Sequence, residues 1–87
     1  MAYKLLIVED EKEKATGIAY LTGKYNPECR PVLLAHDGRE GYEKATAEQP
    51  DIIVTDIRMP EMDGLEMIRE LKKAGCSAEF IVLSGYA

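Results

Sequence analysis

The 87-residue sequence has no tryptophan, a single histidine and only two cysteines. Cys29 and Cys76 lie far apart without a C-x-x-C spacing, which argues against a zinc site, and we expect both to be reduced structural thiols. The histidine, His36, precedes the turn pair Asp37-Gly38 and has no obvious partner in the sequence. We therefore expect it to be a solvated loop residue.

Long apolar runs and an excess of basic residues are also missing. The longest apolar runs, 5–8 and 80–83, are far too short for a transmembrane helix or a signal-peptide core, so we expect a cytoplasmic protein. Sixteen acidic residues against eleven basic ones give a net charge of −5, which argues against direct binding to nucleic acid or an anionic membrane. Cations and basic surfaces are the expected ligands.

The apolar residues that are present predict an α/β fold. Four short runs rich in Ile, Val and Leu, which is typical of strands buried on both faces, occupy 3–8, 32–35, 51–55 and 79–83. The stretches between them have helical spacing, with Asp63 as an N-cap and Gly75 as a helix stop. This alternation predicts one domain with an open, doubly wound parallel sheet.

Three acidic residues follow two of the predicted strands. Glu9 and Asp10 come after the first strand and Asp56 after the third, and these strands are neighbours in the order 2-1-3-4. Carboxylates crowded at one edge repel one another unless a cation lies among them, and a few hard oxygen ligands suit Mg²⁺. A metal there would also prepare Asp56 to accept a phosphoryl group as an aspartyl phosphate.

Ser84 follows the fourth strand at the same edge, so its hydroxyl could hydrogen-bond a phosphoryl oxygen, and Gly85 leaves the approach open. Taken one at a time, these residues have simpler interpretations. An aspartate at a strand end commonly caps a turn, and an acidic pair before a helix is favourable beside the helix dipole. The combination of three acids and a hydroxyl at three strand ends favours a functional site.

The segments "LLIVEDE", "TDIRMPEMDG" and "IVLSGYA" resemble the receiver domain of two-component response regulators, which has a flavodoxin-like fold. The resemblance implies that Asp56 accepts a phosphoryl group from a histidine kinase. It also implies that Asp10 binds Mg²⁺ directly, that Glu9 acts through water, and that the Arg58 backbone carbonyl completes the protein ligands.

The same resemblance implies roles for residues around the acids. Ser84 corresponds to the switch hydroxyl, and Pro60 and Gly64 match the loop that shapes the approach to the site. The side chains of Arg58 and Tyr86, two positions after Asp56 and Ser84, are expected at the mouth of the site.

The segments "DIRMP" and "LSGYA" most resemble those of receivers joined to AraC-type helix-turn-helix domains. This resemblance implies a DNA-binding effector outside these residues. In the family the domain continues through a helix, a lysine-bearing fifth strand and a final helix. We therefore expect residues 1–87 to be the N-terminal two thirds of a receiver, with its fourth strand exposed. An exposed strand of this kind favours a homodimer or strand-exchanged association.

Two other function classes stay open. Phosphatases of the haloacid dehalogenase type need Asp-x-Asp, whereas this chain has Asp56-Ile57-Arg58, and Ser84 lacks the Gly-x-Ser-x-Gly frame of a serine hydrolase. A non-phosphorylated interaction module is the other alternative. We expect a domain that catalyses its own phosphorylation and dephosphorylation but is not an enzyme for an external substrate.

Overall fold

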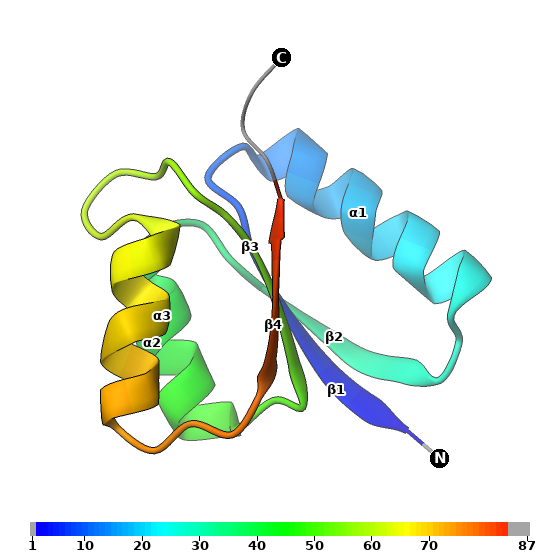
Figure 1. Cartoon of the computed structure of the whole chain (residues 1–87). Coiled ribbons are helices and arrows are strands. Elements are labelled where there is room, and N and C mark those ends of the chain that lie inside the picture. The colour runs from blue at the N-terminus through cyan, green and yellow to red at the C-terminus, as the bar shows by residue number, and fades with distance from the viewer. Residues whose placement is uncertain (1, 84–87) are drawn as a thin grey trace.

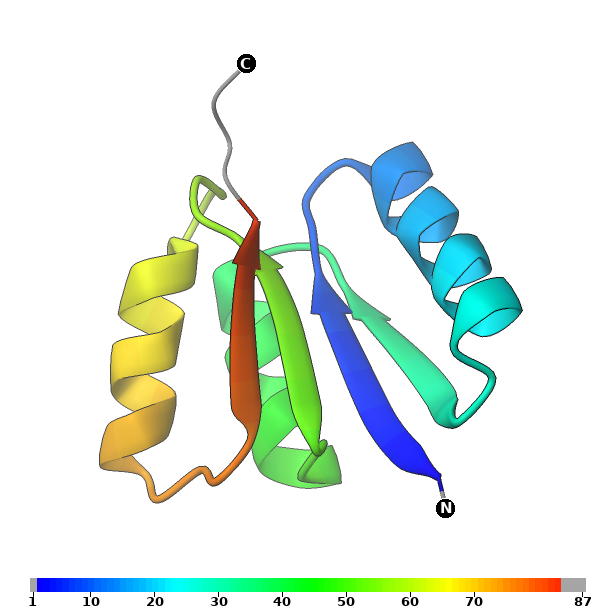
Figure 2. The same ribbon diagram turned by 45° about the vertical axis from the view of Figure 1, so that its right-hand side comes forward.

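The computed structural model describes residues 2–83, which form a parallel sheet with helices on both faces (Figure 1). In chain order the elements are β1 (Tyr3–Val8), α1 (Lys12–Tyr25), β2 (Cys29–Ala35), α2 (Gly38–Glu48), β3 (Ile52–Asp56), α3 (Gly64–Lys73) and β4 (Glu79–Leu83). Helix α1 covers one face of the sheet, and α2 and α3 lie together on the other (Figure 2). The predicted flavodoxin-like architecture is confirmed.

The strand order is β2-β1-β3-β4, and every neighbouring pair is parallel, as predicted. Val8 at the end of β1 lies opposite Ala35 of β2 on one side and Thr55 of β3 on the other. The residues that follow Val8 and Thr55 therefore emerge at the same edge of the sheet. This register brings the first and third strand ends together.

Most of the core lies between the sheet and the α2–α3 face. Its fully buried members are Leu6, Val8, Ala35, Ala45, Ile53, Met67 and Leu71. Leu5 and Ile7 alternate with Leu6 and Val8 along β1 and are also buried, together with Ala15 of α1. Strand β1 is thus buried on both faces, as its unbroken apolar run predicted.

The prediction of burial on both faces is wrong for β2, whereas the expected exposure of the fourth strand is confirmed. These two strands lie at the edges of the described sheet, and β4 leaves Ile81 half exposed and Val82 41% exposed. Strand β2 also begins at Cys29, three residues earlier than predicted. An edge strand has a neighbour on one side only, so an apolar run alone does not indicate full burial. Association through β4 stays a prediction.

The predicted signals at both ends of α3 are confirmed, and α2 has a similar cap. Asp63 caps α3 by accepting a hydrogen bond from the Glu66 backbone N–H, and Asp37 caps α2 in the same way through Glu40. Gly75 follows α3 with a φ of 86°, a left-handed conformation that suits glycine.

Two further expectations concern the thiols and the membrane. Cys29 and Cys76 are both free and partly buried, as predicted. Within residues 2–83, none of the helices has the length and apolar character needed to cross a membrane.

Gly64 provides a test of the packing that fixes the end of β3. A Cβ atom at this position would lie 2.0 Å from the Asp56 carbonyl oxygen, a backbone atom that cannot move aside cheaply. Gly64→Ala should therefore lower the free energy of unfolding by about 1–3 kcal/mol, measured by urea denaturation.

Gly17→Ala is the matched control, because a Cβ there would meet nothing within 4 Å. In the middle of α1 this change should raise stability by about 0.5–1 kcal/mol. Equal effects of the two substitutions would contradict the packing described for Gly64.

Candidate functional site

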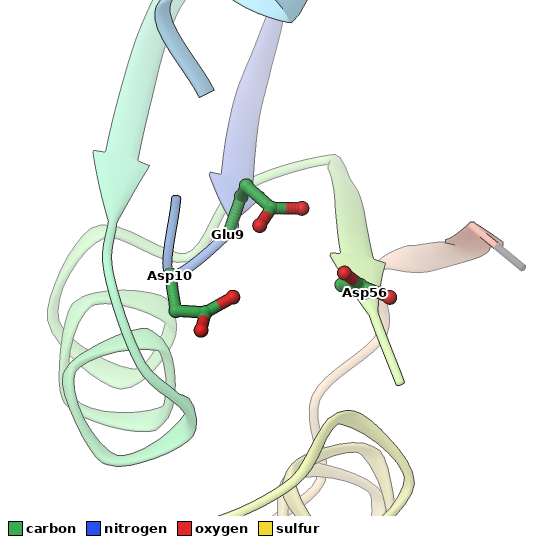
Figure 3. Close-up of side chains that lie close together, drawn as sticks. All are labelled: Glu9, Asp10 and Asp56. Carbon is green, nitrogen blue, oxygen red and sulfur yellow. The ribbon is translucent and has the colours of Figure 1, made fainter. Parts of the chain in front are cut away.

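Three carboxylates gather at the edge of the sheet where β1 and β3 end (Figure 3). Glu9 and Asp10 directly follow β1, and Asp56 is the last residue of β3. Each carboxylate offers an oxygen, and these oxygens lie within 4.8 Å of one another. The predicted meeting of the three acids is confirmed.

The Asp56 carboxylate is held in a defined orientation. Its Oδ1 accepts a hydrogen bond of 2.7 Å from the Ile57 backbone N–H, while the residue as a whole is 7% exposed. The Gly64 N–H donates to the Ile57 carbonyl at 2.7 Å and so joins the start of α3 to the segment after β3. The backbone on both sides of Asp56 is therefore fixed. Oδ2 faces the space between Asp56, Glu9 and Asp10 (Figure 3), which we call the acidic compartment.

Glu9 is the most deeply buried of the three acids. Its side chain is inaccessible to solvent, and Oε2 accepts a hydrogen bond of 3.0 Å from the Glu11 backbone N–H. Oε1 is buried and makes no hydrogen bond within residues 2–83. Burial raises the pKa of Glu9 above its ordinary value, and Asp10 and Asp56 act in the same direction, against the lowering by the Glu11 N–H and by Lys14.

Lys14 of α1 supplies a positive charge to this compartment. Its Nζ lies 3.4 Å from Glu9 Oε1 and 3.6 Å from Asp56 Oδ2. The neighbouring Glu9 carboxylate raises the pKa of the Lys14 ammonium, so the side chain is charged at neutral pH.

Sequence reasoning missed Lys14. The signal that could have revealed it is its place in the first turn of α1, because a lysine near the positive end of a helix dipole is unfavourable unless an anion compensates it. Glu9 and Asp56 are those anions.

The prediction that His36 is solvated and without a partner is wrong. The residue is half-buried, and its Nδ1 lies 3.2 Å from the Glu9 carbonyl oxygen. Its backbone N–H donates to Glu40 Oε1 at 2.8 Å. The first contact joins the ends of β1 and β2, and the second joins the end of β2 to α2. The Glu9 contact depends on a tertiary neighbour that the local sequence does not reveal.

The remaining predicted site residues divide into two groups. Arg58 and Pro60 are exposed in the segment between β3 and α3, and Gly64 is buried against the Asp56 backbone. The expected place of the Arg58 side chain at the mouth of the site stays a prediction. Ser84, Gly85 and Tyr86 lie outside the described residues, so their predicted roles stay predictions.

The donor set fits a hard divalent cation. Carboxylate oxygens are the ligands that Mg²⁺ prefers, and it commonly uses one or two of them together with water. The buried Glu9 Oε1 makes no hydrogen bond among the described residues and lies 3.4 Å from the Lys14 ammonium, so it is able to accept a hydrogen bond from water bound to a cation. The three acids together are able to hold such an ion.

Comparison with known proteins gives the family. The response regulator receiver domain model matches residues 5–87, nearly the whole chain. The chain belongs to the response regulator receiver domain family. The fold, with its strand order 2-1-3-4 and acids at the ends of β1 and β3, agrees with that membership.

Similar proteins include both curated regulators and solved receiver structures. The transcriptional regulatory protein YesN of Bacillus subtilis is 39% identical over 84 residues, which cover 97% of this receiver and 23% of YesN. This receiver thus spans about a quarter of that relative's length.

Two solved structures share the fold closely. The N-terminal domain of an uncharacterized Wolinella succinogenes protein is 37% identical with a TM-score of 0.88, covering 99% of this chain and 67% of the other. A two component transcriptional regulator AraC from Clostridium phytofermentans is 33% identical with a TM-score of 0.83, covering 99% and 69%. These likenesses extend the resemblance of the motifs to the whole described fold.

Glu9→Gln tests the electrostatics of the receiver's acidic edge. Because burial raises the pKa of the Glu9 carboxyl, the ionised form at pH 7 costs folding stability, and the neutral amide removes that cost. We expect the metal-free protein to gain on the order of 1 kcal/mol at pH 7, measured by urea denaturation.

Glutamine retains an oxygen that can accept the Glu11 N–H, so the existing hydrogen bond is not lost. At a pH low enough to protonate Glu9, the difference between the two proteins should shrink. A less stable variant at pH 7 would show that Lys14 outweighs the burial of the charge.

Proposed function

We propose that this receiver is a phosphoacceptor signalling domain, phosphorylated on Asp56 by a histidine kinase in a Mg²⁺-dependent reaction. The observation that carries the proposal is the gathering of Glu9, Asp10 and Asp56 within 4.8 Å at the edge of a receiver-type sheet. Of these acids, Asp56 alone ends a central strand, opposite the acidic pair. That position favours Asp56 as the phosphoacceptor.

The chemistry proposed for Asp56 is direct nucleophilic attack. A carboxylate oxygen of Asp56 forms a bond to phosphorus while the bond from phosphorus to the kinase histidine nitrogen breaks, and the imidazole leaves with the electron pair. Oδ1 is engaged by the Ile57 N–H, which orients the carboxylate, and Oδ2 faces the other acids.

The proposed metal ligands are the Asp10 and Asp56 carboxylates and the Arg58 backbone carbonyl, with Glu9 acting through water. Asp10 is exposed and Glu9 buried, so the two acids reach the compartment from different depths. When bound, Mg²⁺ would neutralise the charge of the carboxylate and of the incoming phosphoryl group. The site residues hold and orient the reactants, and Ser84 and Gly85 are proposed to contact the phosphoryl oxygens.

A role in signalling fits the chain better than the other classes. Position 58 is an exposed arginine, so the second aspartate of a haloacid dehalogenase phosphatase is lacking. We therefore propose a domain that turns over only its own phosphoryl group and is not an enzyme for an external substrate. We also propose that the domain is cytoplasmic. Its partners would be a histidine kinase and an effector domain.

The effector is proposed to be a DNA-binding domain of the AraC type. YesN, which is similar to this chain, is described as a transcriptional regulatory protein, and a similar solved structure is described as a two component transcriptional regulator AraC. In this scheme DNA binding belongs to the effector, because the receiver segment carries a net charge of −5.

Asp56→Asn should abolish phosphorylation. Acetyl phosphate or phosphoramidate with Mg²⁺ should add one phosphoryl group to the wild-type protein and none to the variant, as measured by intact mass spectrometry. Asp51→Asn is the matched control, because Asp51 lies at the opposite end of β3 and accepts a hydrogen bond from the Lys4 N–H.

Undiminished labelling of Asp56→Asn would contradict the assignment of Asp56 as the phosphoacceptor. Absence of labelling in the wild-type protein under the same conditions would favour the interaction module instead.

Arg58 and Tyr86 are proposed to control access of water to the aspartyl phosphate. Replacing either by Ala should change the lifetime of the phosphorylated protein more than it changes Mg²⁺ affinity, because their side chains are expected at the mouth of the site and not among the ligands. The decay of the phosphorylated mass with time gives the lifetime. Identical lifetimes of the aspartyl phosphate in the wild type and both variants would contradict the proposed control of water access.

A further inference from the structure

The acidic compartment already contains one cation that belongs to the chain. Lys14 Nζ lies between Glu9 Oε1 at 3.4 Å and Asp56 Oδ2 at 3.6 Å, and both of these carboxylates come from buried residues. The two acids are provided by different strands, so the ammonium joins α1 to the ends of both β1 and β3. We propose that Lys14 is a tethered counter-cation that occupies the site in the metal-free protein and must withdraw from Asp56 when Mg²⁺ binds.

The proposal follows from the charges in the site. Three carboxylates near one another need positive charge, and Lys14 supplies part of it without a metal. A divalent ion bound to Asp56 would lie close to the same oxygen that the ammonium now approaches, and two cations in that space repel each other. Metal and Lys14 therefore compete for one set of oxygens.

The position of Lys14 allows this exchange. The side chain is 41% exposed and begins at the start of a surface helix, so its ammonium can move into solvent without breaking the core. Asp10, the proposed direct ligand, makes no ion pair with Lys14 among the described contacts and is exposed. An incoming ion can thus meet Asp10 before it displaces Lys14 from Asp56.

The inference rests on the proposed metal site and adds a determinant of its affinity. The lysine lowers the affinity for Mg²⁺ and keeps the metal-free acids partly neutralised. Lys14 affects the metal only through the carboxylates that it pairs with, so it is a competitor of the metal and not a catalytic residue.

The test is a calorimetric Mg²⁺ titration of the wild-type protein and of four variants. Lys14→Gln should bind Mg²⁺ about two- to fivefold more tightly, the scale of a partly exposed ion pair. Lys14→Arg keeps the charge and should remain close to wild type, which separates charge from packing. Lys12→Gln makes the same change in net charge at an exposed residue of the same turn, which forms no ion pair with the acids within residues 2–83, and should change affinity less.

The fourth variant separates this proposal from the proposed function. Asp10→Asn should weaken Mg²⁺ binding strongly; an unchanged affinity would place the metal elsewhere and overturn the proposed site. If Asp10→Asn weakens binding but Lys14→Gln binds no more tightly than wild type, the site stands and the competition is overturned. Mg²⁺ binding by neither wild type nor Lys14→Gln would overturn both.

A second measurement follows the lysine itself. Amine labelling read residue by residue by mass spectrometry should show Lys14 becoming more reactive on addition of Mg²⁺, with Lys12 as the internal reference. Unchanged Lys14 reactivity at saturating Mg²⁺ would contradict its displacement.

Discussion

The repulsion among Glu9, Asp10 and Asp56 is the constraint on which the functional end of this receiver depends. Three carboxylates within 4.8 Å, one of them with a solvent-inaccessible side chain, destabilise the folded protein unless positive charge is placed among them. The fold cannot relieve this by separating the acids, since β1 and β3 are hydrogen-bonded neighbours in the centre of the sheet. Stability and ligand binding are therefore linked at this edge.

The rest of the structure holds the acids in place. Buried Leu6, Ile7 and Val8 fix β1, and Ile53 fixes β3, so the residues after them have little freedom. The close approach of Gly64 to the Asp56 carbonyl and the contact of His36 with the Glu9 carbonyl secure the connecting segments. A rigid acidic edge of this kind is suited to bind a cation that the protein does not itself supply.

Much of this arrangement could be predicted from the sequence. The unbroken apolar runs and the helical stretches between them predicted the α/β order, and the neighbouring positions of the first and third strands predicted that Asp56 would meet Glu9 and Asp10. These predictions succeed because hydrophobic periodicity and the rules for parallel sheets act over whole elements.

The errors concern features that depend on tertiary neighbours. Strand β2 is only partly buried because it lies at the edge of the described sheet, and the partners of His36 come from two other segments. Lys14 was missed because its partners are five and 42 positions away in the sequence, and its long side chain could equally have pointed to solvent. Ion pairs between elements have no fixed spacing along a chain.

The most direct test of the account is a crystal structure of the protein soaked with Mn²⁺, located by its anomalous scattering as a substitute for Mg²⁺. The account predicts one ion among the Asp10 and Asp56 carboxylates and the Arg58 carbonyl, with the Lys14 ammonium moved away from Asp56. An ion bound elsewhere, or an acidic edge that stays free of metal with Lys14 still paired to Asp56 at saturating Mn²⁺, would contradict it.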